Sequence, residues 1–338
     1  MGLEILALAI VSFVIALGLT GWLKPRFGQA LLDLPNDRSS HTQPTPRGGG
    51  LGFCLAFAIT SLLGWGLSSV WPTAVLNLFP NPLYVVLVLL PLAIVGLLDD
   101  LFTLSAKVRY AVQLSAAAIA LLSFGAFSLT GLPETLWVTL PMGSVTLIGF
   151  TALVNFYNFM DGLDGLVASV TAIQLGFLAL YLQQPIWWLL VAALLGFLWW
   201  NWSPAKIFMG DVGSTVLGAS VAIALIVPAA DPSLNVAALA ITLPLTADAI
   251  YTLTRRLLKG ENIFQAHRTH LYQRLQQSGW NHRHVAIAYG LWTVLLAVLI
   301  GEWDGVGSLL GLGISGLIII AGEYYLNARL KTTSPSQS

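Results

Sequence analysis

Two adjacent carboxylates, Asp99 and Asp100, end a long apolar segment and are followed by Lys107 and Arg109. Two carboxylates at the edge of an apolar segment are costly unless a cation or protons neutralise them. The pair therefore predicts a functional site. Two solvated aspartates that cap a helix are the alternative interpretation.

A second cluster places a polar residue at every third position: Asn155, Asn158, Asp161 and Asp164. At this spacing the four side chains form a slowly drifting stripe along a helix, or along a helix that continues into a turn. Amide and carboxylate groups suit a hydroxylated, nitrogen-rich ligand. The Asp-x-x-Asp-Gly pattern is not a calcium loop, because the ligand order and terminal Glu of an EF-hand are missing.

The third cluster extends from Asn201 to Ser214 and contains Lys206, Phe208 and Asp211. Asp211 directly precedes an apolar segment, so it is either the N-cap of the next helix or a metal-binding carboxylate. Mg²⁺ is usually bound by one or two carboxylates together with phosphate oxygens. Phe208 is either a stacking surface for a base or an interfacial aromatic residue.

The fourth cluster is the basic segment from Arg255 to His284. Part of its charge is an ordinary topology signal, but the core from His267 to Arg274 is denser in His and Arg than topology requires. These side chains suit a diphosphate, which Arg can contact in a bidentate manner. Two smaller features are the turn that begins Arg47-Gly-Gly-Gly and Asp248, for which we favour a structural role.

The elements that position these clusters are membrane helices. The 338 residues are 57% hydrophobic and 9% charged, whereas a soluble domain carries about a quarter charged residues. The mean hydropathy is +0.80. The formal net charge of zero gives no indication of a nucleic-acid partner, and the lone Cys54 is interpreted as a small core residue.

Apolar runs predict an all-α, polytopic membrane protein with about eleven transmembrane helices. We expect one membrane-embedded domain over residues 1–331 and a disordered tail over 332–338. The first run is too long for a signal peptide and lacks a preceding basic residue. The predicted runs are 2–23, 49–70, 82–98, 110–130, 142–159, 165–182, 186–202, 212–230, 235–254, 285–301 and 306–326.

The charges fix a predicted orientation. All 15 basic residues fall in or beside the odd-numbered connections and the C-terminal tail, whereas the even-numbered connections carry acidic residues alone: Glu134, Asp231, Glu302 and Asp304. The positive-inside rule then places the N-terminus outside and the C-terminus in the cytoplasm. The polar clusters lie on the cytoplasmic side of the lipid bilayer in this topology.

Taken together, the clusters resemble the polyprenyl-phosphate N-acetylhexosaminyl-1-phosphate transferase family. The resemblance extends from Asp33 to Arg283 and includes, in the family's order, Pro-Arg-Gly-Gly-Gly, Gly-Leu-Leu-Asp-Asp, the Asn/Asp stripe, Pro-Ala-Lys-Ile-Phe-Met-Gly-Asp and the His/Arg loop. It implies ten or eleven spans in a bacterial inner membrane and a cytoplasmic active site. The implied reaction moves an N-acetylhexosamine 1-phosphate from a UDP-sugar to undecaprenyl phosphate and starts a cell-surface glycan.

The resemblance also implies roles for individual residues. Asp211 would hold Mg²⁺, for which Mn²⁺ is the expected substitute, with Asp99 and Asp100 beside it as catalytic and metal-binding carboxylates. The uridine end of the substrate would bind Asn155, Asn158, Asp161, Asp164 and Phe208, with Asn201 as a further substrate-binding residue. Phosphate groups would contact Arg47, Lys206, Arg268 and the catalytic His270. The sequence leaves a homodimer open.

One departure concerns the sugar. Members that use UDP-N-acetylglucosamine typically carry Asp-Arg-x-His-x-His-His in the last loop, whereas this chain has His267-Arg268-Thr269-His270-Leu271-Tyr272-Gln273. The loop is more similar to the branch that starts O-antigen chains of lipopolysaccharide with 6-deoxy-N-acetylhexosamines. A phospho-enzyme mechanism stays open beside direct transfer. A secondary transporter is the rival function class, since intramembrane carboxylates also mark ion pathways.

Overall fold

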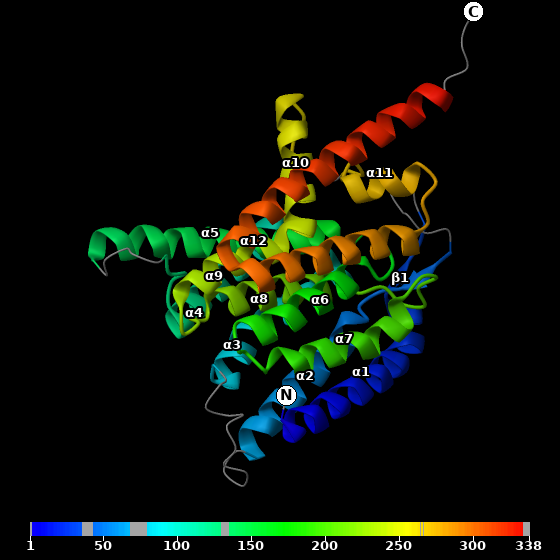
Figure 1. The fold of residues 1–338 in the computed structure, drawn as a ribbon. Helices are drawn as coiled ribbons and strands as arrows, with labels where there is room; N and C mark the ends of the chain where they lie inside the picture. The colour runs from blue at the N-terminus through cyan, green and yellow to red at the C-terminus, as the bar shows by residue number, and fades with distance from the viewer. Residues whose placement is uncertain are drawn as a thin grey trace, which may run out of the picture.

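The computed structural model of the chain describes residues 2–35, 43–67, 80–129, 135–263, 265 and 267–333. These residues are almost entirely helical (Figure 1). The elements of the first half are α1 (Leu3–Ala30), β1 (Leu32–Asp33), β2 (Thr45–Pro46), α2 (Gly50–Leu67), α3 (Pro82–Phe102), α4 (Ala106–Phe124) and α5 (Leu136–Met160). Those of the second half are α6 (Leu166–Tyr181), α7 (Trp187–Asn201), α8 (Asp211–Ile226), α9 (Pro232–Ala238), the 3-10 helix η1 (Leu239–Thr242), α10 (Leu243–Leu258), α11 (Leu271–Gln277) and α12 (His282–Thr333).

Every apolar run predicted from the sequence overlaps a helix, although residues 68–70 of the second run and residue 130 of the fourth lie outside the described residues. The ninth run is shared by α9, η1 and α10, and the last two runs both belong to α12, whose backbone turns at Asp304 (φ 44°, ψ −119°). Within the described ranges, six helical segments are long and apolar enough to cross a membrane, and α6, α7 and α8 are shorter apolar helices. The all-α membrane fold is thus confirmed, whereas the eleven spans and the orientation stay predictions.

The centre of the fold is α8. Every residue from Val212 to Ile226 is buried, and α8 packs against α2, α3, α5 and α6. Small residues allow the neighbouring backbones to approach closely. A Cβ atom added at Gly96 of α3 would lie 2.6 Å from the Val212 Cα. The start of α8 is therefore held directly against the last turns of α3.

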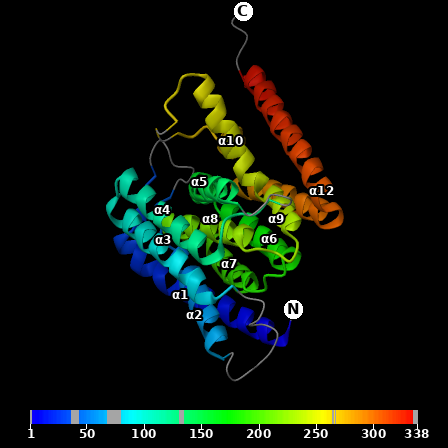
Figure 2. The same ribbon diagram turned by 90° about the vertical axis from the view of Figure 1, so that its left-hand side faces the viewer.

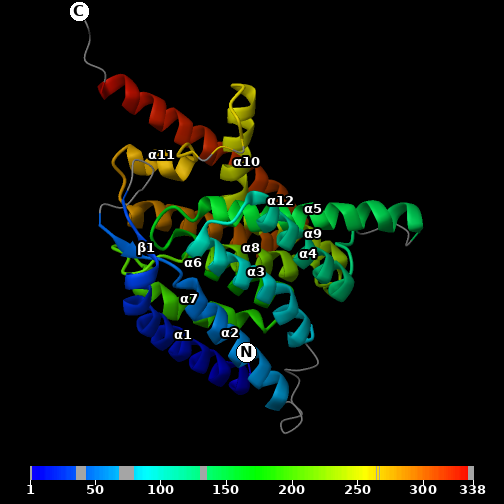
Figure 3. The same ribbon diagram turned by 180° about the vertical axis from the view of Figure 1, so that it is seen from behind.

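Two groups of helices flank this centre. On one side, α1 packs against α2 and α7, as the view from behind shows (Figure 3). On the other side, α12 packs against α6, α9, α10 and α11. The outer part of α10 projects from the bundle, and the last part of α12 diverges from it (Figure 2).

Several features of the prediction lie beyond the described residues. Glu134, one of the acidic residues behind the predicted orientation, belongs to a segment outside them. At the C-terminus, α12 continues to Thr333, and the remainder of the predicted tail, residues 334–338, is likewise outside.

Candidate active site

The first predicted carboxylate pair lies where three helices meet. Asp99 and Asp100 are in the last turn of α3, and Asp211 is the first residue of α8. Both α3 carboxylates are nearly enclosed, with 8% of Asp99 and 4% of Asp100 exposed. Close packing of α3 on α8 brings these three side chains together, as the sequence predicted.

Asp100 caps α8 from the neighbouring helix. Its Oδ1 accepts from the backbone N–H of Asp211 at 3.2 Å, and its Oδ2 accepts from that of Val212 at 3.3 Å. The first N–H groups of a helix have no partner within the helix, and their positive end favours an anion. Gly210, at φ 75°, holds the N-cap position of α8, and no side chain of its own caps the helix. The alternative that Asp211 is a simple N-cap is therefore wrong.

Asp99 and Asp211 share one cation, Arg109. The Arg109 Nη1 lies 2.9 Å from Asp99 Oδ2 and 3.5 Å from Asp211 Oδ2. Arg109 is in the first turn of α4, which Ser105 begins by accepting a hydrogen bond from the Val108 N–H at 3.4 Å. The sequence analysis counted Arg109 only as a topology charge. Arg109 lies in the first turn of the helix that follows the Asp99–Asp100 pair, and this proximity in sequence could have identified it as a site residue.

Arg47 reaches the same cluster from the opposite side. The β1–β2 pair lies beside α1, and the backbones of Pro46, Gly49 and Gly50 are hydrogen-bonded to those of residues 208–209. In this position the Arg47 Nη2 donates to the Asp100 carbonyl oxygen at 2.8 Å, and its Nε lies 3.5 Å from Asp100 Oδ1. Two guanidinium groups thus border the carboxylates.

The polar stripe of α5 contacts two different helices. Asn155 pairs with Gln113 of α4, donating to its Oε1 at 2.7 Å. One turn later, Asn158 donates to Ser214 Oγ of α8 at 3.0 Å and lies beside the Asp211 carboxylate. The stripe therefore leads along α5 into the carboxylate cluster, and Gln113 is a site neighbour that the sequence analysis did not identify.

Asp161 follows the end of α5 and has unusual surroundings. Within the described part of the chain, its carboxylate has no hydrogen-bond or ion-pair partner, whereas the carboxylates of Asp211, Asp100 and Asp164 are near it. Burial and these three like charges hold the pKa of Asp161 well above its usual value. Such a group needs a proton or a ligand with positive charge or donor groups.

Asp164, in the same loop, differs from Asp161 because its carboxylate has partners for both oxygens. Its Oδ1 lies 3.2 Å from His282 Nδ1, and its Oδ2 accepts from the Ala205 N–H at 3.1 Å. Burial opposes ionisation of Asp164, but the hydrogen bond and charge of His282 and the Ala205 N–H outweigh it, so its pKa lies below its usual value. Asp164 therefore links the α5–α6 loop to α12 and to the α7–α8 connection.

Asn201, the last residue of α7, and two residues of the α7–α8 connection have different surroundings. Asn201 is 4% exposed; its Oδ1 accepts from the Gly165 N–H at 3.0 Å and its Nδ2 donates to the Ile207 carbonyl at 3.0 Å. Phe208 is half-buried, and its backbone pairs with Pro46 and Gly49. Lys206 is exposed, with its Nζ 5.4 Å from the centre of the Trp200 ring. No ion pair joins Lys206 to the described aspartates.

The His/Arg loop is anchored by Asp248. This fully buried carboxylate accepts from the Leu271 N–H at 2.8 Å, the Tyr272 N–H at 3.1 Å and the Tyr289 hydroxyl at 2.7 Å. The structural role favoured for Asp248 agrees with these contacts. His270 is 2% exposed, and its Nδ1 lies 3.6 Å from Asp248 Oδ1. The predicted phosphate contact of His270 stays a prediction, because its charge partner is Asp248.

The loop still lies close to the polar stripe. The Tyr272 hydroxyl donates to the Phe159 carbonyl at 3.0 Å, and the ring centres of Phe159 and His270 are 6.4 Å apart. Arg268 lies in this loop and lines a basic cavity. Four segments distant in sequence thus converge around the ends of α3, α5 and the start of α8.

Comparisons with known proteins agree with this arrangement. The profile of glycosyl transferase family 4 matches residues 82–229, which include α3, α4, α5 and α8. A probable undecaprenyl-phosphate N-acetylglucosaminyl 1-phosphate transferase of Bacillus subtilis is 31% identical over 75% of this chain and 71% of that protein.

The chain belongs to the family of polyprenyl-phosphate sugar-phosphate transferases. Another member that it resembles is the undecaprenyl-phosphate alpha-N-acetylglucosaminyl 1-phosphate transferase of Yersinia pestis, 32% identical over 80% of this chain and 77% of that protein. The phospho-N-acetylmuramoyl-pentapeptide-transferase of Staphylococcus carnosus is 30% identical over 89% of this chain and 99% of that protein. Family membership confirms the resemblance found in the sequence and argues against the secondary transporter.

Asp99 and Asp211 of this transferase are placed so that they could bind a divalent cation together. Within the described ranges, no three His, Cys, Asp or Glu side chains form a ready metal site. Asp100 is already engaged by the N-terminus of α8, but Asp99 and Asp211 present oxygens to the same cationic group. Two carboxylates are sufficient where substrate phosphates complete the coordination of Mg²⁺. The donor set thus suits Asp99 and Asp211 better than all three aspartates.

Proposed function

We propose that this protein transfers an N-acetylhexosamine 1-phosphate from a UDP-sugar to undecaprenyl phosphate. An oxygen of the lipid phosphate attacks the sugar-linked phosphorus of the UDP-sugar. The bond from that phosphorus to the bridging oxygen of the diphosphate breaks, and UMP leaves with this oxygen. The observation that carries the proposal is the convergence of Asp99, Asp161 and Asp211 with two guanidinium groups at the ends of α3 and α5 and the start of α8. The names of the relatives support the same reaction class.

We assign the binding of Mg²⁺ to Asp99 and Asp211. When bound, the cation would neutralise the diphosphate and the developing charge on the leaving phosphate. Asp100 has a positioning role, because it holds the N-terminus of α8 and thereby sets the place of Asp211. The sequence analysis had placed both Asp99 and Asp100 beside Asp211 as metal-binding carboxylates, and this proposal keeps only Asp99 in that role.

Arg109 and Arg47 are suited to the substrate phosphates. In the absence of substrate, Arg109 pairs with Asp99 and Asp211, and both carboxylates would exchange that partner for the cation. The released guanidinium could then contact phosphate oxygens, for which its donor geometry is suited. Arg47 lies on the Asp100 side of the cluster and could contact the same group.

The uridine end is assigned to the loop after α5. Asp161 has carboxylate oxygens without a donor in the described structure, and the imide N–H of uracil could supply one. Asn158 extends the same polar surface, and Phe208, half-buried in the neighbouring connection, offers a ring for stacking. Asn155 and Asn201 are assigned to positioning, because their amides join α5 to α4 and the two loops to each other.

The location follows from the charge pattern of the sequence. We place the site on the cytoplasmic face of a bacterial inner membrane, where nucleotide-activated sugars are made. The relatives include transferases named for N-acetylglucosamine and for phospho-N-acetylmuramoyl-pentapeptide. For this chain we propose an N-acetylhexosamine and favour a 6-deoxy sugar of an O-antigen, on the loop from His267 to Gln273.

The test is UMP release by the purified protein with undecaprenyl phosphate, Mg²⁺ and a panel of UDP-sugars. We expect UMP with at least one N-acetylhexosamine, and a rate reduced about 100-fold or more in Asp211→Asn. Glu302→Gln, at an exposed carboxylate outside the site, is the matched control. If no sugar yields UMP the proposed reaction is wrong, and if Asp211→Asn retains full activity the metal assignment is wrong.

Direct transfer and a phospho-enzyme intermediate are separated by omitting the lipid acceptor. Direct transfer requires that UMP appears only when undecaprenyl phosphate is present. Radiolabel from the sugar phosphate that stays on the protein without acceptor would identify an aspartate nucleophile instead.

A further inference from the structure

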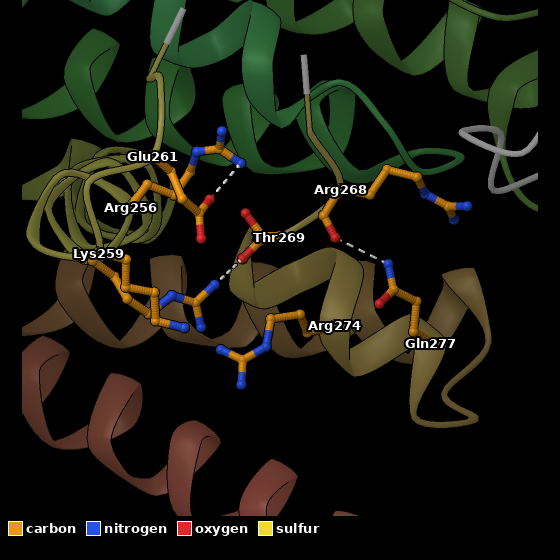
Figure 4. Close-up of a pocket in the computed structure, with 8 residues that line it drawn as sticks. Arg256, Lys259, Glu261, Arg268, Thr269, Arg274 and Gln277 are labelled. Atoms are coloured by element: carbon orange, nitrogen blue, oxygen red, sulfur yellow. Dashed lines mark hydrogen bonds and ion pairs between the residues drawn. The ribbon is translucent and has the colours of Figure 1, made fainter. Parts of the chain in front are cut away.

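A basic cavity of about 290 Å³ lies between the end of α10, α11 and the segment that joins them (Figure 4). Five of its lining residues are cationic, and Glu261 is the acidic one. The lining consists of Arg255, Arg256, Lys259, Glu261, Arg268, Thr269, Arg274 and Gln277. This composition is typical of an anion site.

Internal ion pairs neutralise the cavity only in part. Glu323 of α12 is shared between Arg255, at 3.2 Å, and Arg274, whose Nη2 lies 3.0 Å from the second oxygen. Glu261 pairs with Arg256 at 3.2 Å. Two carboxylates thus pair with three of the cations, and Lys259 is exposed with no ion pair among the residues that the structure describes. The cavity retains an excess of positive charge.

The guanidinium groups are held in fixed positions. Arg255 donates to the Thr269 carbonyl at 2.6 Å, and Arg274 contacts both oxygens of Glu323. Arg268 is oriented differently, because its side chain extends away from the Arg274 guanidinium (Figure 4). Preorganised guanidinium donors favour phosphate, since less freedom is lost when the ligand binds.

The surface beside the cavity is apolar. Leu257 is 64% exposed and Leu258 is 83% exposed, and both directly precede Lys259 at the end of α10. This end of α10 projects from the helix bundle (Figures 1 and 2). A helix with leucines on one side and Arg and Lys on the other is typical of the membrane interface, where apolar groups contact acyl chains and cations contact headgroups.

We propose that this cavity binds the phosphate headgroup of an anionic membrane phospholipid, whose acyl chains lie against Leu257 and Leu258. The inference goes beyond the proposed transfer reaction, because it requires neither UDP-sugar nor polyprenyl phosphate. The ion-pair partner of Arg255 and Arg274 is Glu323 of α12, not the aspartates of the transferase site. A bound headgroup would join α10 to α11 and so stabilise the segment that carries Arg268 and His270.

The test is binding of dioctanoyl phosphatidylglycerol to the purified full-length protein in neutral detergent, followed by thermal unfolding. We expect a saturable rise in the unfolding temperature that phosphatidylcholine of the same length does not give. Lys259→Gln should weaken the apparent affinity about fivefold, since one cation near anionic lipid contributes about that factor. Lys259→Arg should retain the affinity.

The matched control is Lys24→Gln, a lysine at the end of α1 whose Nζ lies 5.6 Å from the Trp200 ring centre, outside the cavity. Lys24→Gln should bind phosphatidylglycerol like the unmodified protein. Equal affinities of Lys259→Gln and Lys24→Gln would refute the site. Because Lys259 is exposed and unpaired in the described structure, its replacement should leave the fold unchanged.

Two further measurements distinguish a phospholipid headgroup from free phosphate and from polyprenyl phosphate as the ligand of the cavity. Inorganic phosphate at the same concentration should not displace phosphatidylglycerol; equal competition would make the cavity a site for free phosphate. In neutral detergent, Lys259→Gln should leave the KM for polyprenyl phosphate unchanged. A raised KM would assign the cavity to the acceptor of the transfer reaction and overturn the phospholipid proposal. Absence of any transfer activity leaves the binding result intact.

Discussion

Asp248 and Asp161 are aspartates of one apolar protein with opposite surroundings. Asp248 is fully buried and accepts hydrogen bonds from Leu271, Tyr272, Tyr289 and Thr252, with His270 beside it. Asp161 has no donor among the described residues and lies near three other carboxylates.

The difference between the two aspartates distinguishes a structural carboxylate from one that binds a ligand. A buried carboxylate is stable only where donors or positive charge replace its hydration. Asp248 receives these from its own chain, so its contribution is the attachment of the α10–α11 segment. Asp161 must receive them from a ligand or remain protonated, which is why strongly perturbed carboxylates without partners indicate functional sites.

The largest expected effect is the loss of stability when Asp248 is replaced. Asp248→Ala removes the acceptor of four hydrogen bonds and the partner of His270, so the free energy of unfolding should fall by about 3 to 5 kcal/mol. Thermal unfolding of the purified protein measures this. The control is Asp231→Ala, an exposed N-cap that accepts from the Ser233 N–H at 2.8 Å, and its replacement should lower the free energy of unfolding much less. Similar losses for both variants would contradict the structural assignment.

Asp161→Asn should have the opposite profile. The amide keeps the shape of the side chain but loses its charge, so we expect transfer activity to fall about 100-fold while the unfolding temperature is unchanged or higher. UMP release and thermal unfolding are measured on the same preparation, with Glu302→Gln as the charge-matched control.

The pH dependence of that stability gain has a defined sign. Because the pKa of Asp161 is raised in the folded protein, its ionisation costs stability as pH rises above the usual carboxyl range. The gain in Asp161→Asn should therefore shrink as pH is lowered toward 4. A variant that unfolds at a lower temperature than the unmodified protein at neutral pH would show that Asp161 is structural after all.

A smaller effect is expected from one donor of Asp248. Tyr289→Phe removes the hydroxyl that donates to Asp248 at 2.7 Å and should lower the free energy of unfolding by about 2 kcal/mol, as for a hydrogen bond to a charged group. Tyr181→Phe is the comparison, since its hydroxyl donates to Asp304 at 2.7 Å in an exposed pair. Its loss should be below about 1 kcal/mol because water replaces the donor. If both variants lost the same free energy of unfolding, burial could not be the reason why the Tyr289 hydrogen bond is strong.

The smallest effect concerns His267, beside the Asp248 network. Burial, with the positive charges of His270, Arg256 and Arg255, lowers the pKa of His267 to about 4. The unfolded chain then binds a proton before the folded one, so stability should fall as pH drops from about 6.5 to about 4. His267→Gln should flatten this part of the unfolding-temperature profile, and the exposed His284→Gln should not. A profile that both variants share with the unmodified protein would exclude His267 as its origin.

The class of the protein and the composition of its site were readable from the sequence. Apolar runs predicted where every described membrane helix lies, because hydropathy is a local property and a bilayer sets the required length. The spacing of Asn155, Asn158, Asp161 and Asp164 predicted a polar stripe along a helix that continues into a turn. These inferences depend only on residues close together in the chain.

Tertiary structure decided what each charge does. Asp100 meets the N–H groups of α8, which lie 111 and 112 residues away, and Arg109 meets Asp211, 102 residues away. Asn201 became a positioning residue for the same reason, since its Oδ1 accepts from the Gly165 N–H, 36 residues away. Whether a carboxylate can bind a metal, cap a helix or anchor a loop depends on which donors lie within hydrogen-bond distance of it. These donors come from distant parts of the chain, so only the packing of the helices supplies them.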